Sequence, residues 1–285
     1  MKKGFKTWLN TTRRAIIKVV YNYYEHGVGK NSAALAYYLL FALFPFLIFI
    51  SNLVGLLDFN IYAVTSALYE IFPKAVVGVI ESYLDHVSKV SSHTLLWFSL
   101  VFTIWFPMRA AAGLMDDVRR AYGQGLPKRP MIYILKQLIY TVVFLVVIVL
   151  TLILTLMGKR VITSIGEVFP NLSVETYEYI LRVWQYLRFL PIALLMIAAI
   201  ATLYMISLDQ KPKVRSIMPG IIGSLVSWLI LSVAFSFYIE NFANYSMIYG
   251  TLGTIVITMV WLYLTAFTLI IGAEFNAALL NVKNE

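Results

Sequence analysis

Six long apolar runs alternate with shorter stretches that hold most of the charged residues of the chain. A helix of about 20 residues rises about 30 Å, the thickness of the hydrocarbon core of a membrane. The pattern therefore predicts an all-α integral membrane protein with one six-helix membrane domain over residues 32–280. The expected spans are about 32–54, 93–113, 136–157, 188–207, 216–239 and 250–275.

The segments outside these runs are patterned as well. Residues 5–24 repeat apolar positions at three- and four-residue spacing, which predicts that segment 1–31 holds an amphipathic helix in the cytoplasmic membrane interface. A targeting presequence is the competing interpretation. Gly27 and Gly29 are expected to end this helix. Segment 55–92 predicts two further interfacial helices on the outer face, and segment 158–187 predicts a wall beside them.

Composition and charge set the class and the orientation. Sixty per cent of the residues are hydrophobic and the mean hydropathy is +0.80, which excludes an ordinary soluble protein. Sixteen Lys and Arg residues fall on segments assigned to the cytoplasm and six on the other side, so both termini, including tail 281–285, are expected inside. The basic excess then reflects topology. The expected partners are membrane lipids, including anionic ones, and no nucleic acid.

Small residues mark the spans expected at the centre of the bundle. Gly220, Gly223 and Ser224 in the fifth span allow close helix approach, and the sixth adds Gly253 and Gly272. The first, second, fifth and sixth spans are therefore the predicted centre. In the first span, Pro45 predicts either a hinge or a static kink.

Two charged residues lie inside the apolar runs. Arg109 in the second span and Glu274 in the sixth both fall near the cytoplasmic end of the hydrocarbon. A charge at mid-membrane costs roughly 2.5–3.5 kcal/mol, and pairing offsets part of that cost. They are either a structural ion pair or two snorkelling side chains, or else a gate or an anion- or proton-coupling site.

A polar turn separates the last two spans, and threonines follow it. The turn is a candidate outer site for a polar headgroup or solute, or equally a corner that satisfies loose backbone groups. Thr251, Thr254 and Thr258 share one helix face, so they line a path or bond back to their own helix. The polar residues of the turn are Asn241, Asn244, Tyr245, Ser246 and Tyr249.

The search for enzyme chemistry gives a negative expectation. The chain has no cysteine and three histidines, and no His and acid set stands at metal-ligand spacing. No phosphate-binding glycine loop or nucleophile elbow is present. We therefore expect no catalytic residues, no metal and no cofactor.

Several short motifs are spread along the chain: Arg109 and segments 32–38, 43–45, 119–123, 219–220, 242–246, 249–253, 261–263 and 272–277, with Arg119 and Arg120 opening the third of these segments. Together they resemble the YihY/BrkB family of bacterial inner-membrane proteins, formerly labelled the ribonuclease BN family. The resemblance implies a six-helix protein of the bacterial plasma membrane with both termini inside. It also implies association with virulence, serum resistance and envelope lipid transport.

The leading functional hypothesis is a transporter or lipid-handling protein of the cell envelope, with an amphiphile or solute moving along the four central spans. Arg109 would meet an anionic group on the cytoplasmic side, and the polar turn would shape the outer mouth. A non-transporting scaffold is the alternative, and a membrane ribonuclease is the least favoured. The substrate and the oligomeric state do not follow from the sequence.

Overall fold

A computed structural model describes residues 2–56, 65–66, 68–69, 74, 77–78, 80–81, 93–168, 189–210, 212–242 and 251–284. In this part of the chain the structure is all-helical, as predicted, with no strand. The long helices within the described residues are α1 (Lys2–Glu25), α2 (Val28–Leu56), α5 (His93–Ala121), α6 (Pro130–Val168), α8 (Phe189–Ser207), α9 (Val214–Phe242) and α11 (Thr251–Asn284).

Six of these helices, α2, α5, α6, α8, α9 and α11, are long and apolar enough to cross a membrane, which confirms the predicted number of spans. Several are longer than the apolar runs. Residues 158–168, predicted as part of the outer wall, continue α6, and residues 281–284, predicted as a tail, continue α11. A hydropathy pattern ends with the apolar side chains, whereas the helical hydrogen bonds continue. Segment 169–188 lies outside the described residues, as does most of 55–92.

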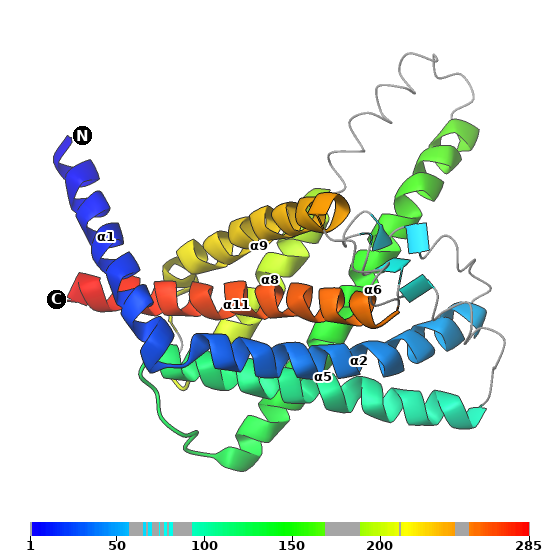
Figure 1. Cartoon of the computed structure of the whole chain (residues 1–285), viewed down its shortest axis with the longest axis horizontal. Coiled ribbons are helices and arrows are strands. Elements are labelled where there is room, and N and C mark those ends of the chain that lie inside the picture. Colours follow the sequence, from blue (N-terminus) through cyan, green and yellow to red (C-terminus); the bar gives the residue numbers. More distant parts are fainter. Residues whose placement is uncertain are drawn as a thin grey trace.

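Helix α11 is the centre of the bundle. It packs against α9, α2, α1 and α5, and α2 packs along α5. This agrees with the predicted grouping of the first, second, fifth and sixth spans. Helix α6 contacts α5 and α8 and crosses behind α2 and α5 in Figure 1.

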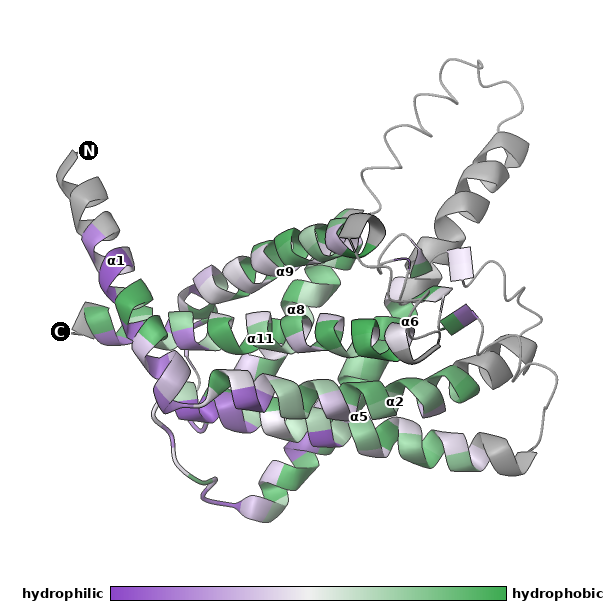
Figure 2. Cartoon of the chain, in the orientation of Figure 1, coloured by the Kyte–Doolittle hydropathy of each residue, from purple (hydrophilic) through white to green (hydrophobic). Residues whose placement is uncertain are grey.

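Both ends of the described chain lie at the same end of the bundle, where α1 leaves α2 and α11 finishes (Figure 1). Hydrophilic residues gather at this end, around the junction of α1 and α2 and the end of α5, whereas the remaining length is mainly hydrophobic (Figure 2). The largest fully buried side chains, Tyr204, Met115 and Leu203, belong to a core cluster to which α2, α5, α6, α8, α9 and α11 all contribute.

Two residues, His26 and Gly27, separate α1 from α2. Gly27 has a φ of 64°, a left-handed conformation that glycine adopts without steric strain. The prediction that Gly29 also breaks the helix is wrong, because α2 begins at Val28 and Gly29 lies inside it. Pro45 lies within α2, which continues on both sides of it. The chain therefore passes from α1 to α2 through His26 and the left-handed Gly27.

Candidate functional site

A buried carboxylate lies in the part of α11 nearest the C-terminus. Glu274 is 1% exposed. Nδ2 of Asn22 donates to its Oε2 at 2.8 Å, and Nδ1 of His26 lies 2.6 Å from its Oε1. Because an ionised carboxylate only accepts hydrogen bonds, Nδ1 then carries the proton in this contact. Asn22 belongs to the last turn of α1 and His26 directly follows α1, so Glu274 ties the end of α1 to α11.

A second carboxylate, Asp117 on α5, joins this site through the junction of α1 and α2. Nδ2 of Asn31 donates to Oδ1 of Asp117 at 2.6 Å and to the main-chain oxygen of His26 at 3.1 Å. Nη1 of Arg120 donates to the same two acceptors, each at 3.1 Å. A carbonyl group at the end of α1 is thereby satisfied. We call Asn22, His26, Asn31, Asp117, Arg120 and Glu274 the carboxylate cluster.

Each carboxylate of the carboxylate cluster lies against a nitrogen donor group. Arg120 forms an ion pair with Asp117, and His26 faces Glu274. Because burial penalises a charge without partners, these contacts lower the cost of placing two carboxylates inside the protein.

Arg119 forms a separate buried site on α5 and is 3% exposed. Its Nε and Nη2 donate to the main-chain oxygen of Gly125 at 3.0 and 2.8 Å, and Nη1 donates to that of Ser207 at 2.9 Å. Nη2 also donates to Asp209 at 3.0 Å, which holds the pKa of that carboxyl group below its ordinary value. The guanidinium carbon lies 5.4 Å from the ring centroid of Tyr133. We call this group the arginine clamp.

Glycines bring α9 and α11 into direct contact. A Cβ atom added to Gly220 would collide with the main-chain oxygen of Gly272 and with the side chain of Asn276. Asn276 Oδ1 accepts a bond from the Gly220 amide at 2.7 Å, and its Nδ2 donates to the oxygen of Ile217 at 2.7 Å. The close approach expected from small residues in these two spans is confirmed at this contact.

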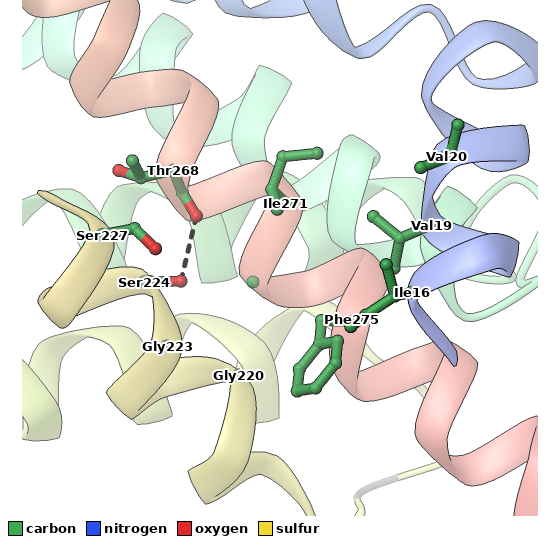
Figure 3. Close-up of a pocket in the computed structure, with 11 residues that line it drawn as sticks. Ile16, Val19, Val20, Gly220, Gly223, Ser224, Ser227, Thr268, Ile271 and Phe275 are labelled. Atoms are coloured by element: carbon green, nitrogen blue, oxygen red, sulfur yellow. Dashed lines mark hydrogen bonds between the residues drawn. The ribbon is translucent and has the colours of Figure 1, made fainter. Parts of the chain in front are cut away.

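A groove of about 320 Å³ opens beside this contact, between α1, α9 and α11 (Figure 3). Among the described residues that line it, none is charged. A Cβ atom added to Gly223 meets no described atom within 4 Å, so this glycine faces the open space of the groove. Ser224 donates to the main-chain oxygen of Thr268 at 3.0 Å and is satisfied. The lining is Ile16, Val19, Val20, Gly220, Gly223, Ser224, Ser227, Thr268, Ile271, Gly272 and Phe275.

The structure does not bring Arg109 and Glu274 together as an ion pair. Arg109 lies on an exposed position of α5, and its guanidinium carbon lies 5.9 Å from the ring centroid of Tyr38 on α2. Arg109 precedes Asp117, which borders the site of Glu274, by eight residues. Eight residues turn a helix by about 80° and advance it by about 12 Å, so the two side chains leave α5 in different directions at different depths. A gating role for either residue stays a prediction.

The predicted outer site falls mostly outside the described residues. Asn244, Tyr245, Ser246 and Tyr249 are not described, and Asn241 is placed only as part of α9.

The threonines of the predicted path lie on α11, where the backbone but not the side chain of Thr251 is described. The hydroxyl group of the buried Thr258 donates to the main-chain oxygen of Thr254 at 2.9 Å. For Thr258 this bond agrees with the second alternative, a bond back to its own helix, and the roles of Thr251 and Thr254 stay predictions.

Sequence reasoning missed the partners of Glu274. Asn22 lies near the end of the N-terminal helix and His26 directly follows it, whereas the apolar pattern of residues 5–24 predicts only that this helix lies in the membrane interface. One signal was available for Asn276, because an amide in a long apolar run needs partners inside the protein.

These features define a multi-pass helical membrane protein whose N-terminal helix is bonded to its last span. The chain matches the family described as Virulence factor BrkB over residues 19–285, and it belongs to that family. The resemblance carried by the sequence motifs is thereby confirmed.

Relatives within this group carry two kinds of name. The ribonuclease-like protein YfkH of Bacillus subtilis is 29% identical over 266 residues, 93% of this chain and 95% of YfkH. A UPF0761 membrane protein of Alteromonas mediterranea is 30% identical over 124 residues, and one of Vibrio campbellii is 37% identical over 97 residues. These two matches cover 42% and 30% of the relatives' own lengths. No solved structure matches the chain.

Proposed function

We propose that the protein handles lipid in the bacterial inner membrane, with both termini on the cytoplasmic side. One observation carries this proposal: an uncharged groove between α9 and α11 has the N-terminal helix α1 as its third wall. Helix α1 is joined to α2 by Gly27 and to α11 by the carboxylate cluster. One wall of the groove is therefore α1, a helix that is held by its connection to α2 and by side-chain bonds to α11.

The lining favours an amphiphile over a polar solute. A polar solute that enters such a groove gives up hydrogen bonds to water, and this costs free energy unless the walls replace them. Of the three hydroxyl groups on the walls, that of Ser224 already donates to Thr268 and that of Thr268 to the main-chain oxygen of Thr265 at 2.8 Å. A hydrocarbon chain needs no such bonds and gains from apolar contact.

In this proposal the carboxylate cluster acts as the gate, in place of a pair between Arg109 and Glu274. Glu274 holds the end of α1, so the bonds from Asn22 and His26 control whether α1 stays against the groove. Arg109 keeps the role that the sequence predicts for it. It is an exposed charge within a span, and its guanidinium group meets an anionic group.

The proposal is tested with purified protein in vesicles. We expect the protein to accelerate the movement of a fluorescent phospholipid between leaflets, measured as the fraction reached by an external quencher. Gly223→Leu, which fills the groove without a collision, should slow this movement, whereas Val226→Leu on an exposed position of the same helix should not. A rate equal to that of empty vesicles would sink the proposal.

The alternative, a membrane scaffold without transport, is favoured by the direct contact between Gly220 and Gly272. It predicts that Gly223→Leu changes no phenotype of the cell, while a collision at Gly220 does. We further infer that the protein is not an enzyme, because both carboxylates of the carboxylate cluster are engaged by protein donors. Cleavage of RNA by the purified wild type, lost in Glu274→Gln and Asp117→Asn, would overturn this.

A further inference from the structure

The groove has a polar end as well as apolar walls. Ile16, Gly220 and Phe275 lie toward one end of it, and Val20 and Thr268 lie toward the other (Figure 3). Helix α1 continues past Ile16 toward its N-terminus, and α9 continues past Gly220 toward its own N-terminus. Both helices therefore leave the groove at the same end.

Bases follow on both helices beyond that end. Arg13 precedes Ile16 by three residues, so the two share a face of α1. Arg13, Arg14, Lys213 and Arg215 are all exposed. None of the four has a salt-bridge partner in the part of the chain that the structure describes. Residues 10–24 and 212–239 contain no acid to balance them.

We infer that the groove binds one acyl chain of an anionic glycerophospholipid, with the phosphate group among Arg13, Arg14, Lys213 and Arg215. The inference rests on the proposed lipid-handling function and names its substrate class. The apolar walls select the chain, and four unbalanced bases at one end select the charge of the headgroup. A zwitterionic lipid fits the same walls but gains less from the bases.

Gly223 supplies the variant that tests the walls. Leucine at this position extends into the open space of the groove, and it is a better helix former than glycine, so the helix itself is not weakened. Gly223→Ala is a second variant that fills less of the groove. Val226→Leu is the matched control on the same helix, because Val226 is 48% exposed and is not part of the lining.

The charge of the headgroup is tested by two matched pairs of substitutions. Arg13→Gln with Arg14→Gln removes two bases beside the groove. Lys128→Gln with Arg129→Gln removes two exposed bases from the connection between α5 and α6, away from the lining. Both pairs lower the net charge equally, so a difference between them reports on position.

The experiment uses the full chain in phosphatidylcholine nanodiscs that contain a photoreactive acyl analogue of either phosphatidylglycerol or phosphatidylcholine. Cross-links to segments 216–227 and 268–275 are quantified by mass spectrometry relative to those on α6. We expect the phosphatidylglycerol analogue to label these segments at least about five-fold more, since each base near the surface contributes roughly that factor. Gly223→Leu should reduce labelling by both analogues, and Gly223→Ala should reduce it less.

Removal of Arg13 and Arg14 should lower phosphatidylglycerol labelling toward that of phosphatidylcholine, and removal of Lys128 and Arg129 should not. Equal labelling by the two analogues in the wild type, or labelling that Gly223→Leu leaves unchanged, overturns the inference. Labelling as expected, without lipid movement in vesicles, leaves the inference standing and removes the proposed function. Lipid movement in vesicles without labelling of the groove leaves the proposed function standing and overturns the inference.

Discussion

Two buried charges near the same end of the bundle are held in different ways. Arg119 is 3% exposed and Glu274 is 1% exposed. Arg119 donates to two main-chain oxygens, those of Gly125 and Ser207, and to one carboxylate. Glu274 instead accepts from two side chains, Asn22 and His26, at the end of one helix.

This difference indicates that Arg119 is a fixed support of the bundle, whereas Glu274 is a support that α1 can release. The oxygens that Arg119 binds belong to the connection between α5 and α6 and to the end of α8, so it cannot lose them without movement of the membrane-spanning bundle. The partners of Glu274 lie on α1 and the residue after it, beyond the single left-handed residue Gly27. In the proposed gate, α1 therefore leaves Glu274 while the six spans remain packed, and the substitutions below test this.

The largest effect is expected from Arg119→Met. The substitution leaves the oxygens of Gly125 and Ser207 without these donors, and each buried acceptor that loses its donor costs on the order of 1–3 kcal/mol. We expect a lower melting temperature and weaker protection from amide exchange in both α5 and α8. Arg129→Met, at an exposed base nearby, is the control. Melting of Arg119→Met at the wild-type temperature would show that the arginine clamp is not a support.

Glu274→Ala should have a smaller and local effect. It leaves Asn22 and His26 without their acceptor, at a cost on the order of 1–3 kcal/mol. We expect amide exchange in α1 to rise by about ten-fold or more, with little change in α5 and α8. Glu25→Ala removes an exposed acid from the same helix as a control. Equal loss of protection in every helix would make Glu274 a support of the same kind as Arg119.

The spans could be predicted from the sequence because lipid requires long uninterrupted apolar helices. The contact of Gly220 with Gly272 followed from the same logic, since only small residues let two helices touch. Glu274 also stood out as an acid in an apolar run. Its partners could not be predicted, because they depend on where a helix outside the membrane spans docks.

The groove could not be predicted for a related reason. Gly223 and Gly220 lie on one helix in a sequence pattern that suggests close packing at both, yet only Gly220 contacts α11 through its backbone. Which glycine is in contact and which faces open space depends on the angle between two helices, and composition does not give that angle. The role of the turn between α9 and α11 stays a prediction.

Alanine at Gly27 or at Gly123 introduces the same backbone strain, so the two substitutions allow the carboxylate cluster and the arginine clamp to be compared. Gly27 and Gly123 have φ values of 64° and 65°, and a Cβ atom added to either meets no described atom within 4 Å. Alanine in this conformation costs about 1–2 kcal/mol at each position. Gly27→Ala should raise amide exchange in α1 alone, whereas Gly123→Ala should lower the melting temperature through the arginine clamp. Identical exchange patterns in the two variants would contradict the distinction between a releasable and a fixed site.

The smallest effect on stability is expected at Asp209, the exposed residue of the arginine clamp. The bond from Arg119 holds the pKa of Asp209 below its ordinary value, so the folded protein binds a proton there less readily than the unfolded chain. The contribution of this bond to stability is therefore complete above the ordinary carboxyl pKa of about 3.9, and it disappears as the pH falls through the lowered value. We expect Asp209→Asn to melt slightly below the wild type at neutral pH, and the gap to close under more acidic conditions. High salt should also narrow the gap, because the carboxylate is 37% exposed and is screened. A gap that stays constant in acid would mean that Asp209 acts through packing, and the charge of the arginine clamp would then rest on the two main-chain oxygens alone.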